Sequence, residues 1–408
     1  MHPSEDIRGA RSDRLAGMSI VIGITGSIAA VECVKLIREL LRHGAIVRAV
    51  MTPWAERIVG RDAIEFATGE PVITELTGQV EHVKYCGDVP DRADLLLIAP
   101  CTANTLGKMV HGIDDTPVTT FLTTAIGTGI PVMVVPAMHN TMYEHPKVME
   151  NIETAKQMGI RFVEPVFEEK KAKMAGTGVI VEEVLRLLLK GRMKGQKVLI
   201  VTGATVEPID DMRAVTNLAT GRTGISLGTE AYRNGADVML LAGDNVHSIP
   251  EHLEVSRFGT VADLISKVEL LSNEWAVPDM AIFAAGISDY SPVKVEGKLP
   301  SGKENITIEM EPTPKVIERF LRLYPDVFTI GYKAESTGGN REELLKRAYK
   351  KLRELSLGLI VANDLGDVKS DENKVLLITP DKEAFRLEGS KEDIARFIID
   401  KASELKGL

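Results

Sequence analysis

The chain has 408 residues, enough for two domains that each bury a core of their own. Hydrophobic residues make up 44% and charged residues 26%, as in soluble globular proteins, and the net charge of −9 argues against nucleic acid as the main partner. No apolar run reaches the roughly 18 residues that span a bilayer, and the charged segment 1–17 lacks the apolar region of a secretory signal. We therefore expect a cytoplasmic protein that binds no membrane and has a frayed tail over residues 1–17. Three cysteines, Cys33, Cys86 and Cys101, are too few and too scattered for a disulfide framework or a zinc site.

The first predicted domain, residues 18–190, opens with a strand, a glycine turn and a helix. Strand 19–24 is followed by Gly26 and Ser27, and apolar residues at helical spacing predict a helix that ends near Gly44. A second strand, 46–51, ends at Thr52, where no acidic residue is available for the ribose hydroxyls of a dinucleotide. The turn therefore suits FMN, with one phosphate and a ribityl chain, better than NAD. A loop of this kind can also bind nothing.

Two further strands of this domain end in polar residues. The continuous apolar run 94–101 is typical of a buried parallel strand. Thr102, Ala103 and Asn104 follow it at the carboxyl end, where open α/β sheets bind their ligands. A strand at 131–135 runs into the segment PAMHNTMY at 136–143. An amphipathic helix at 182–190 and the polar segment 191–195 mark the domain boundary.

The chain begins a second time at residue 197, in a second predicted domain that spans 191–408. The β-branched run 198–201 is broken by Gly203, and a long polar loop leads to Gly221 and Gly224, where a helix begins. Such a helix start offers free backbone N–H groups and the positive end of the helix dipole, which suit a phosphate. Further strands are expected at 237–242, 280–285 and 359–364, with helices at 225–234 and 341–355. Both halves thus predict an α/β fold with two Rossmann-like domains in series.

The second half resembles phosphopantothenate–cysteine ligases. In that family the sequence GGTREPIDPVR is followed by an Asn and then by SSGKMG. The matching residues of this chain are Gly203, Thr205, Glu207, Pro208, Ile209, Asp210, Arg213, Asn217, Gly221 and Gly224. Val206 stands where the family has Arg, and Arg222 where it has Lys. The resemblance implies a nucleotide site made by Gly203, Asp289, Lys298, Pro314, Lys315, Val316, Ile317, Tyr332 and Lys351. It implies that Asn217 holds an acyl nucleotide and that Lys298 with Mg²⁺ neutralises the triphosphate. A second lysine of the family falls on Leu355.

The first half resembles the homo-oligomeric flavin-containing cysteine decarboxylases, above all the phosphopantothenoylcysteine decarboxylases. GSIAA at 26–30 matches the family's phosphate loop, APCTANTLGK at 99–108 its APATANTxAK run, and PAMHNTMY its PxMNxxMW substrate motif. The resemblance implies that this half is a flavodoxin-like flavoprotein domain. It also implies an FMN site made by Gly26, Ser27, Thr52, Cys101, Thr102, Ala103, Asn104 and Met138. It implies a catalytic group of His82, His139 and Asn140. His139 replaces the family's Asn, and Tyr143 its Trp.

The family's flap, in which a Cys precedes a GRM-like segment, corresponds to KAKMAG at 171–176, but residues 163–171 contain no cysteine. In the relatives that cysteine supplies a proton to the enethiolate, so His139 or a Lys or Glu of the flap is left as the donor. Imidazole titrates near neutrality, which makes His82 the best proton-handling candidate. The alternatives are a surface histidine at 82, a helix cap at Asn140, and solvated side chains at Asp289 and Lys298.

Together the resemblances imply a fused enzyme that ligates 4′-phosphopantothenate to cysteine with CTP and then decarboxylates the product to 4′-phosphopantetheine. ATP is the alternative nucleotide, since the eukaryotic ligases use it. For the first half, a flavin prenyltransferase, a peptide-cysteine decarboxylase and a non-catalytic scaffold remain alternatives. The families also imply a trimer around the flavin site and a dimer of the ligase half, and hence a dodecamer.

Overall fold

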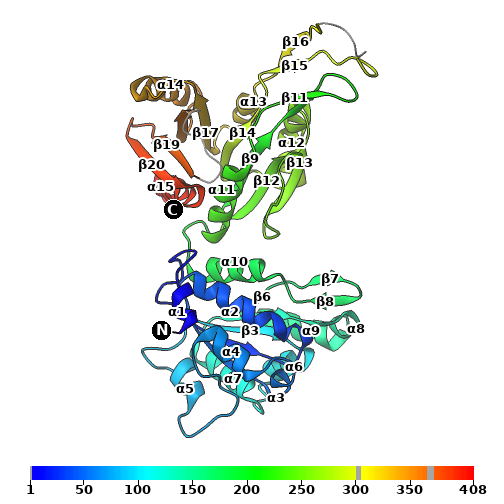
Figure 1. The fold of residues 1–408 in the computed structure, drawn as a ribbon, viewed down its shortest axis with the longest axis vertical. Helices are drawn as coiled ribbons and strands as arrows, with labels where there is room; N and C mark the ends of the chain where they lie inside the picture. Colours follow the sequence, from blue (N-terminus) through cyan, green and yellow to red (C-terminus); the bar gives the residue numbers. More distant parts are fainter. Residues whose placement is uncertain (1, 300–304, 365–371) are drawn as a thin grey trace. The chain divides into compact units, whose positions relative to one another are not determined.

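The computed structural model describes residues 2–299, 305–364 and 372–408 (Figure 1). The chain divides into two compact units, Met1–Leu189 and Lys190–Leu408. The division falls beside the polar segment 191–195. In the part of the chain that is described, no helix has the length and apolar character needed to cross a membrane.

A five-stranded parallel sheet with the order β2-β1-β3-β4-β6 forms the first unit. Its strands are β1 (Ser19–Ile24), β2 (Ile46–Met51), β3 (Leu95–Cys101), β4 (Val132–Pro136) and β6 (Arg161–Phe162). The chain runs outward from β1 to β2 and then returns to β3 on the other side of β1. This is the flavodoxin-like order, which confirms the predicted fold, and ligands bind at the carboxyl ends of the two strands where the direction reverses.

Helices cover both faces of this sheet (Figure 1). One face carries α2 (Cys33–Arg42), α4 (Arg61–Thr68) and α10 (Thr177–Leu188), and the other carries α6 (Ala103–His111), α7 (Pro117–Thr128) and α9 (Pro146–Gln157). The shorter elements are η1 (Ile28–Glu32), α3 (Pro53–Glu56), α5 (Glu81–Cys86) and α8 (Asn140–Tyr143). Along β1, Ile20 and Ile22 enter one core while Val21 enters the other. The central strands β1, β3 and β4 are therefore almost entirely apolar, because neither face of the sheet meets water.

The segment 2–17, expected as a frayed tail, is packed against the first unit instead. It forms the helix α1 (Pro3–Ile7), which contacts α2 and α4. Arg8 Nη1 donates to the carbonyl of Ala45 at 2.7 Å, and the Gly9 amide donates to the carbonyl of Leu41 at 2.9 Å. The side chain of Leu15 is completely buried. The buried Leu15, Ile7 packed against the same core and these hydrogen bonds together hold the segment against the unit.

A small antiparallel sheet with the order β5-β8-β7 joins the flap to the PAMHNTMY segment. Its strands are β5 (Met138–His139), β7 (Val166–Glu168) and β8 (Lys171–Lys173). Met138 pairs with Ala172, and His139 pairs with Lys171. The two segments that the sequence analysis treated separately therefore form one structural element.

The second unit is built on an eight-stranded sheet with the order β13-β12-β9-β14-β17-β18-β19-β20. The strands are β9 (Lys197–Ala204), β12 (Asp237–Gly243), β13 (Glu254–Phe258), β14 (Met280–Gly286), β17 (Phe328–Glu335), β18 (Leu359–Asp364), β19 (Glu372–Ile378) and β20 (Ala384–Ser390). The first six are parallel in the Rossmann order and the last two are antiparallel, so the predicted Rossmann-like fold is confirmed. The direction reverses between β9 and β14.

Helices again cover both faces of the second sheet. The helices α11 (Arg222–Arg233) and α15 (Lys391–Lys406) lie side by side on one face (Figure 1). The other face carries α12 (Val261–Glu274), α13 (Val316–Leu323) and α14 (Arg341–Glu354). The polar loop after β9 contains a hairpin, β10 (Val206–Pro208) and β11 (Ala214–Thr216), and beyond β14 the strand β15 (Tyr290–Pro292) pairs with β16 (Met310–Pro312).

Candidate active sites

A pocket of about 520 Å³ opens in the first unit at the carboxyl ends of β1 and β3. It is lined by four residues predicted to bind FMN, namely Gly26, Thr52, Thr102 and Asn104, and by Trp54, Lys108 and Met142, which the sequence analysis did not assign. Local signals located the first group, because its members lie within three residues of the end of β1, β2 or β3. Lys108 ends the APCTANTLGK motif at 99–108 but was given no role of its own, and Trp54, the second residue of α3, follows no motif.

Gly26 shapes the floor of this pocket. A Cβ atom added at Gly26 would stand 2.5 Å from Cβ of Trp54, so a side chain is excluded there. Nearby, Thr25 Oγ1 donates to the carbonyl of Pro100 at 2.7 Å and accepts from the Thr102 amide at 3.1 Å. These two bonds tie the end of β1 to the end of β3. Gly26 thus lines the pocket with backbone atoms, packs against Trp54 and is held in register with Thr102.

Three residues that are predicted to bind FMN cap helices around the pocket with their hydroxyl groups. The side chains of Ser27, Thr52 and Thr102 accept backbone N–H groups at the starts of η1, α3 and α6, at 3.4, 3.3 and 3.3 Å. A capping hydroxyl still has its own proton to donate, which suits phosphate and carbonyl oxygens. Cys101, in contrast, is buried and outside the lining, and burial raises the pKa of its thiol to about 12, so it stays protonated.

The three predicted catalytic residues of the first unit lie outside the lining of this pocket. His82 sits on α5, and its Nδ1 is buried without a hydrogen-bond partner. His139 is exposed, with Nδ1 3.0 Å from Thr141 Oγ1. Asn140 donates through Nδ2 to Glu144 at 2.7 Å, while its Oδ1 is buried without a partner. Buried, unpaired polar atoms are costly, and such sites commonly serve a ligand.

The flap next to the PAMHNTMY segment contains charged residues and one aromatic contact. It contains no cysteine, and the three free cysteines, at positions 33, 86 and 101, are buried elsewhere. Lys173 Nζ lies 3.2 Å from a carboxylate oxygen of Glu168 and 3.0 Å from one of Glu169. Phe167 meets Tyr143 edge to face with ring centroids 5.2 Å apart. Burial raises the pKa of the Tyr143 hydroxyl. The tyrosine therefore supports the flap as an apolar wall.

In the second unit, the loops after β9 and β14 meet at the point where the strand order reverses. Asn217 Nδ2 donates to the carbonyl of Gly286 at 3.0 Å, and the Ser288 amide donates to Thr205 Oγ1 at 3.0 Å. A Cβ on Gly286 would stand 3.0 Å from Cβ of Asn217, so this contact requires a small residue. The motif residue Asn217 is thus fixed at the carboxyl edge of the sheet.

Two predicted nucleotide-binding residues form an ion pair just beyond β14. The carboxylate of Asp289 contacts the ammonium of Lys315, and both side chains are exposed. The Thr313 amide donates to the Asp289 carbonyl at 2.9 Å, and Thr313 Oγ1 donates to the Ser288 carbonyl at 2.5 Å. Segments distant in sequence therefore present one carboxylate and one ammonium at the same edge.

Lys298 lies on an exposed loop that is tied to the GGTREPIDPVR-like motif. Asp210 Oδ2 accepts from the Leu299 amide at 2.9 Å, and Arg213 Nη2 donates to the Leu299 carbonyl at 2.7 Å. The Leu299 amide, aided by two further backbone amides and the Arg213 charge, holds the pKa of Asp210 below its usual range. Asp210 is consequently an ionised anchor for the backbone next to Lys298.

The remaining predicted nucleotide-binding residues are dispersed. Gly203 has φ +86°, and a Cβ there would stand 2.4 Å from Val246 Cγ2, so only glycine suits this position. The Val316 side chain packs in the core, which leaves its backbone for a ligand.

The Tyr332 hydroxyl is buried without a partner, and burial raises the pKa of Tyr332. Lys351 Nζ lies 3.8 Å from Glu318. Pro314 is exposed, and Ile317 is half-buried.

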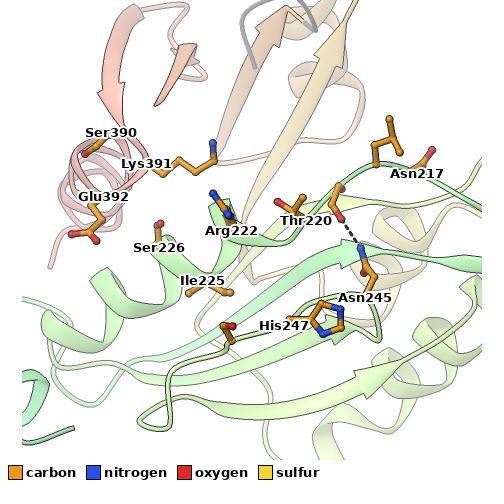
Figure 2. A pocket seen from close by; sticks show the side chains of 13 residues that line it. Asn217, Thr220, Arg222, Ile225, Ser226, Asn245, His247, Ser390, Lys391 and Glu392 are labelled. Atoms are coloured by element: carbon orange, nitrogen blue, oxygen red, sulfur yellow. Dashed lines mark hydrogen bonds between the residues drawn. The ribbon is translucent and has the colours of Figure 1, made fainter. Parts of the chain in front are cut away.

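A pocket of about 880 Å³ opens at the start of α11 (Figure 2). Asn217 lines it, together with Arg222, His247 and Lys391, which come from α11, the segment after β12 and α15. Arg222 had a signal in the family pattern, where a Lys stands at its position. His247 and Lys391 follow no motif, and only the fold brings them here. Within the described ranges, no three His, Cys, Asp or Glu side chains group as metal ligands.

Both halves of the chain match known families. Residues 8–189 match the family Flavoprotein, and residues 193–405 match the DNA/pantothenate metabolism flavoprotein C-terminal domain. The chain is 43% identical to the coenzyme A biosynthesis bifunctional protein CoaBC of Thermococcus kodakarensis, over 99% of this chain and 100% of that relative. The chain belongs to this family of bifunctional coenzyme A biosynthesis proteins. It is likewise 34% identical to the CoaBC protein of Methanocaldococcus jannaschii, over 99% of this chain and 98% of the relative.

Membership in the CoaBC family confirms the predicted bifunctional enzyme of coenzyme A biosynthesis, with a decarboxylase and a ligase domain. It does not favour the prenyltransferase, peptide-decarboxylase or scaffold alternatives for the first half. Among solved structures, the C-terminal domain of a CoaBC protein is 29% identical and covers 53% of this chain and 98% of its own, with a TM-score of 0.44.

Proposed function

We propose that the second unit ligates 4′-phosphopantothenate to cysteine through an acyl nucleotide made from CTP, and that the first unit decarboxylates the product with FMN. The observation that carries this proposal is the position of the two pockets. Each opens at the carboxyl edge of its parallel sheet, and motif residues of the corresponding family line it. The two reactions therefore have separate sites.

The residues of the first pocket fit FMN. Gly26 leaves its backbone open, and the hydroxyls of Thr52 and Thr102 can donate to phosphate or ribityl oxygens. Trp54 offers an apolar surface to an aromatic ring. A bound FMN would supply the oxidising capacity toward the cysteine thiol from which decarboxylation obtains its electron sink. The chain itself must orient the substrate and move protons.

His82 acts, in this proposal, in the flavin site of a neighbouring subunit. It does not line the pocket of its own chain, yet its Nδ1 is buried and unpaired. Exposed apolar side chains around the pocket, Ile28 at 78%, Trp54 at 66% and Met142 at 48%, suit a surface that a second copy covers. A homo-oligomer with trimers around the flavin sites, and a dodecamer overall, accounts for both features.

Asn140 and His139 hold the substrate carboxylate in this proposal. The paired strands β5 and β8 keep the flap next to both residues, and His139 faces Lys171 in the ladder. A proton donor that replaces the missing flap cysteine then comes from His139 or Lys171. Either side chain carries a proton that it can deliver beside the motif.

In the ligase unit, Asp289 and Lys315 contact the nucleotide, Lys298 neutralises the triphosphate, and Asn217 holds the acyl nucleotide. These roles rest on charge neutralisation and positioning, on which acyl and nucleotidyl transfer mainly depend. Mg²⁺ would enter with the phosphates of the nucleotide. CTP is proposed over ATP because fused chains accompany the CTP-dependent relatives.

The test uses the purified full-length protein. We expect a flavin absorption spectrum, pyrophosphate release with CTP rather than ATP, and CO₂ release from phosphopantothenoylcysteine. The variant His82→Asn should lower CO₂ release about 100-fold or more and leave ligation intact. His145→Asn is the control, because His145 caps α9 and Asn is also a good cap. Undiminished CO₂ release by His82→Asn would remove its role, and ligation with ATP alone would overturn the nucleotide assignment.

A further inference from the structure

Within residues 2–189, all of which the structure describes, Lys108 is the single charged side chain that lines the pocket of the first unit. The other polar lining residues are Asn104 and threonines, which are neutral. Lys108 lies on α6, and Asn104, four positions earlier on the same helix, also lines the pocket. Residues four apart share one face of a helix, and their side chains tilt towards its N-terminus. The stem of Lys108 therefore runs back along α6 towards the carboxyl end of β3.

Asp115 fixes the position of this ammonium. Lys108 Nζ donates to Oδ1 of Asp115 at 2.8 Å and to Oδ2 at 2.7 Å. The Lys108 side chain is 20% exposed, while that of Asp115 is 54% exposed and lies outside the pocket lining. An ammonium carries three protons, and the described residues accept only these two. The third proton is therefore available to a ligand in the pocket.

The neutral groups around Lys108 suit a phosphate. Gly26 lines the pocket with backbone atoms, and it begins the segment 26–30 that matches the family's phosphate loop. Thr52 and Thr102 cap helices, and each can still donate its hydroxyl proton. The phosphate of FMN is a monoester, which carries a charge of about −1.5 to −2 at neutral pH. Because hydrogen bonds from a charged donor are roughly twice as strong as neutral ones, the ammonium would make the strongest single contact.

We propose that Lys108 donates its third ammonium proton to the phosphate of FMN, and that this contact makes the pocket prefer FMN to riboflavin. The inference rests on the proposed flavin chemistry of the first unit. Riboflavin has the same ring and ribityl chain but no phosphate, so it offers the ammonium no anion. Asp115 is a positioning residue in this arrangement, because it orients the ammonium from outside the lining.

Flavin titration of the full-length protein, freed of its flavin, tests this contact. Trp54 lines the same pocket, so in a Trp275→Phe background a bound flavin should quench the remaining tryptophan fluorescence. We expect Lys108→Met and Lys108→Gln to bind FMN at least about tenfold more weakly, through loss of a charge-assisted contact. Their affinity for riboflavin should stay within about twofold of the wild-type value. Lys108→Arg keeps the charge and should bind FMN more tightly than Lys108→Met.

Two further variants separate a phosphate contact from a purely structural ion pair. Asp115→Asn breaks the pair but leaves the ammonium of Lys108 charged, so its affinity for FMN should stay within about threefold of the wild-type value. If the pair served only to hold α6 against the loop before α7, Asp115→Asn would lose as much FMN affinity as Lys108→Met. Lys147→Met is the control, because Lys147 is exposed on α9, pairs with Glu150 at 2.5 Å and does not line the pocket.

Wild-type FMN affinity in folded Lys108→Met or Lys108→Gln overturns the inference, as does an equal loss of FMN and riboflavin binding. A loss of FMN affinity in Asp115→Asn as large as that in Lys108→Met overturns it as well. The proposed function is measured separately, by CO₂ release from phosphopantothenoylcysteine. If the wild type binds FMN through Lys108 but releases no CO₂, the proposed decarboxylation fails and the phosphate contact remains.

Discussion

Replacing Gly224 with alanine should displace the start of α11 from the sheet. A Cβ at Gly224 would stand 2.2 Å from Oγ1 and 2.3 Å from Cβ of Thr202, more than 1 Å inside ordinary contact at 3.4 Å. Thr202 cannot move aside, because it is fully buried and its hydroxyl donates to the Gly221 carbonyl at 2.9 Å. Overpacking of a buried contact costs about 1–3 kcal/mol. The same shift would carry the α11 amides away from the pocket, so the nucleotide KM should also rise.

Urea unfolding can measure this cost for the second unit alone. The chain has two tryptophans, so in a Trp54→Phe background the fluorescence comes from Trp275 of the second unit. Gly228→Ala is the control, since its Cβ would meet only side-chain ends, Leu240 Cδ2 at 3.1 Å and Leu253 Cδ1 at 3.4 Å. Alanine there gains up to about 1 kcal/mol in helix propensity. If Gly224→Ala unfolds at the wild-type urea concentration and keeps its nucleotide KM, the steric reasoning is refuted.

Two further predictions concern the loop that carries Lys298. Asp210→Asn should destabilise the second unit, and the difference in urea midpoint from the wild type should depend on pH. Because the Leu299 amide and its other partners lower the folded pKa of Asp210, the stabilisation is present above the unfolded value of about 3.9 and is lost as pH falls through the folded pKa. A difference that stays constant on acidification would contradict this. Lys298→Gln should raise the nucleotide KM about tenfold or more and leave decarboxylation of added phosphopantothenoylcysteine unchanged, and an unaltered KM would remove the assignment.

The sequence predicted those features that have a local signal. Apolar runs followed by polar or glycine residues located Gly26 and Thr102 near strand ends, the resemblance to the ligases located Asn217, and the structure puts all three in pocket linings. The hairpin β10–β11 was missed, because strands of three residues have no readable period. Lys391 was missed for a different reason. Its sequence neighbours indicate only a capped helix, and its approach to Arg222 depends on the packing of α15 against α11.

At two positions where the ligase pattern has a cation, this chain has an apolar residue. Val206, in place of the family's Arg, pairs with Thr216 in the β10–β11 hairpin. Leu355, in place of one helical lysine, packs against the core beneath α14. Both positions are occupied by apolar side chains and supply no charge for phosphates. Arg222 keeps its charge, and Lys391 lies in the same pocket. A triphosphate in this unit would therefore depend for its compensating charge on the lysines assigned to the nucleotide site, Lys298, Lys315 and Lys351, rather than on positions 206 and 355.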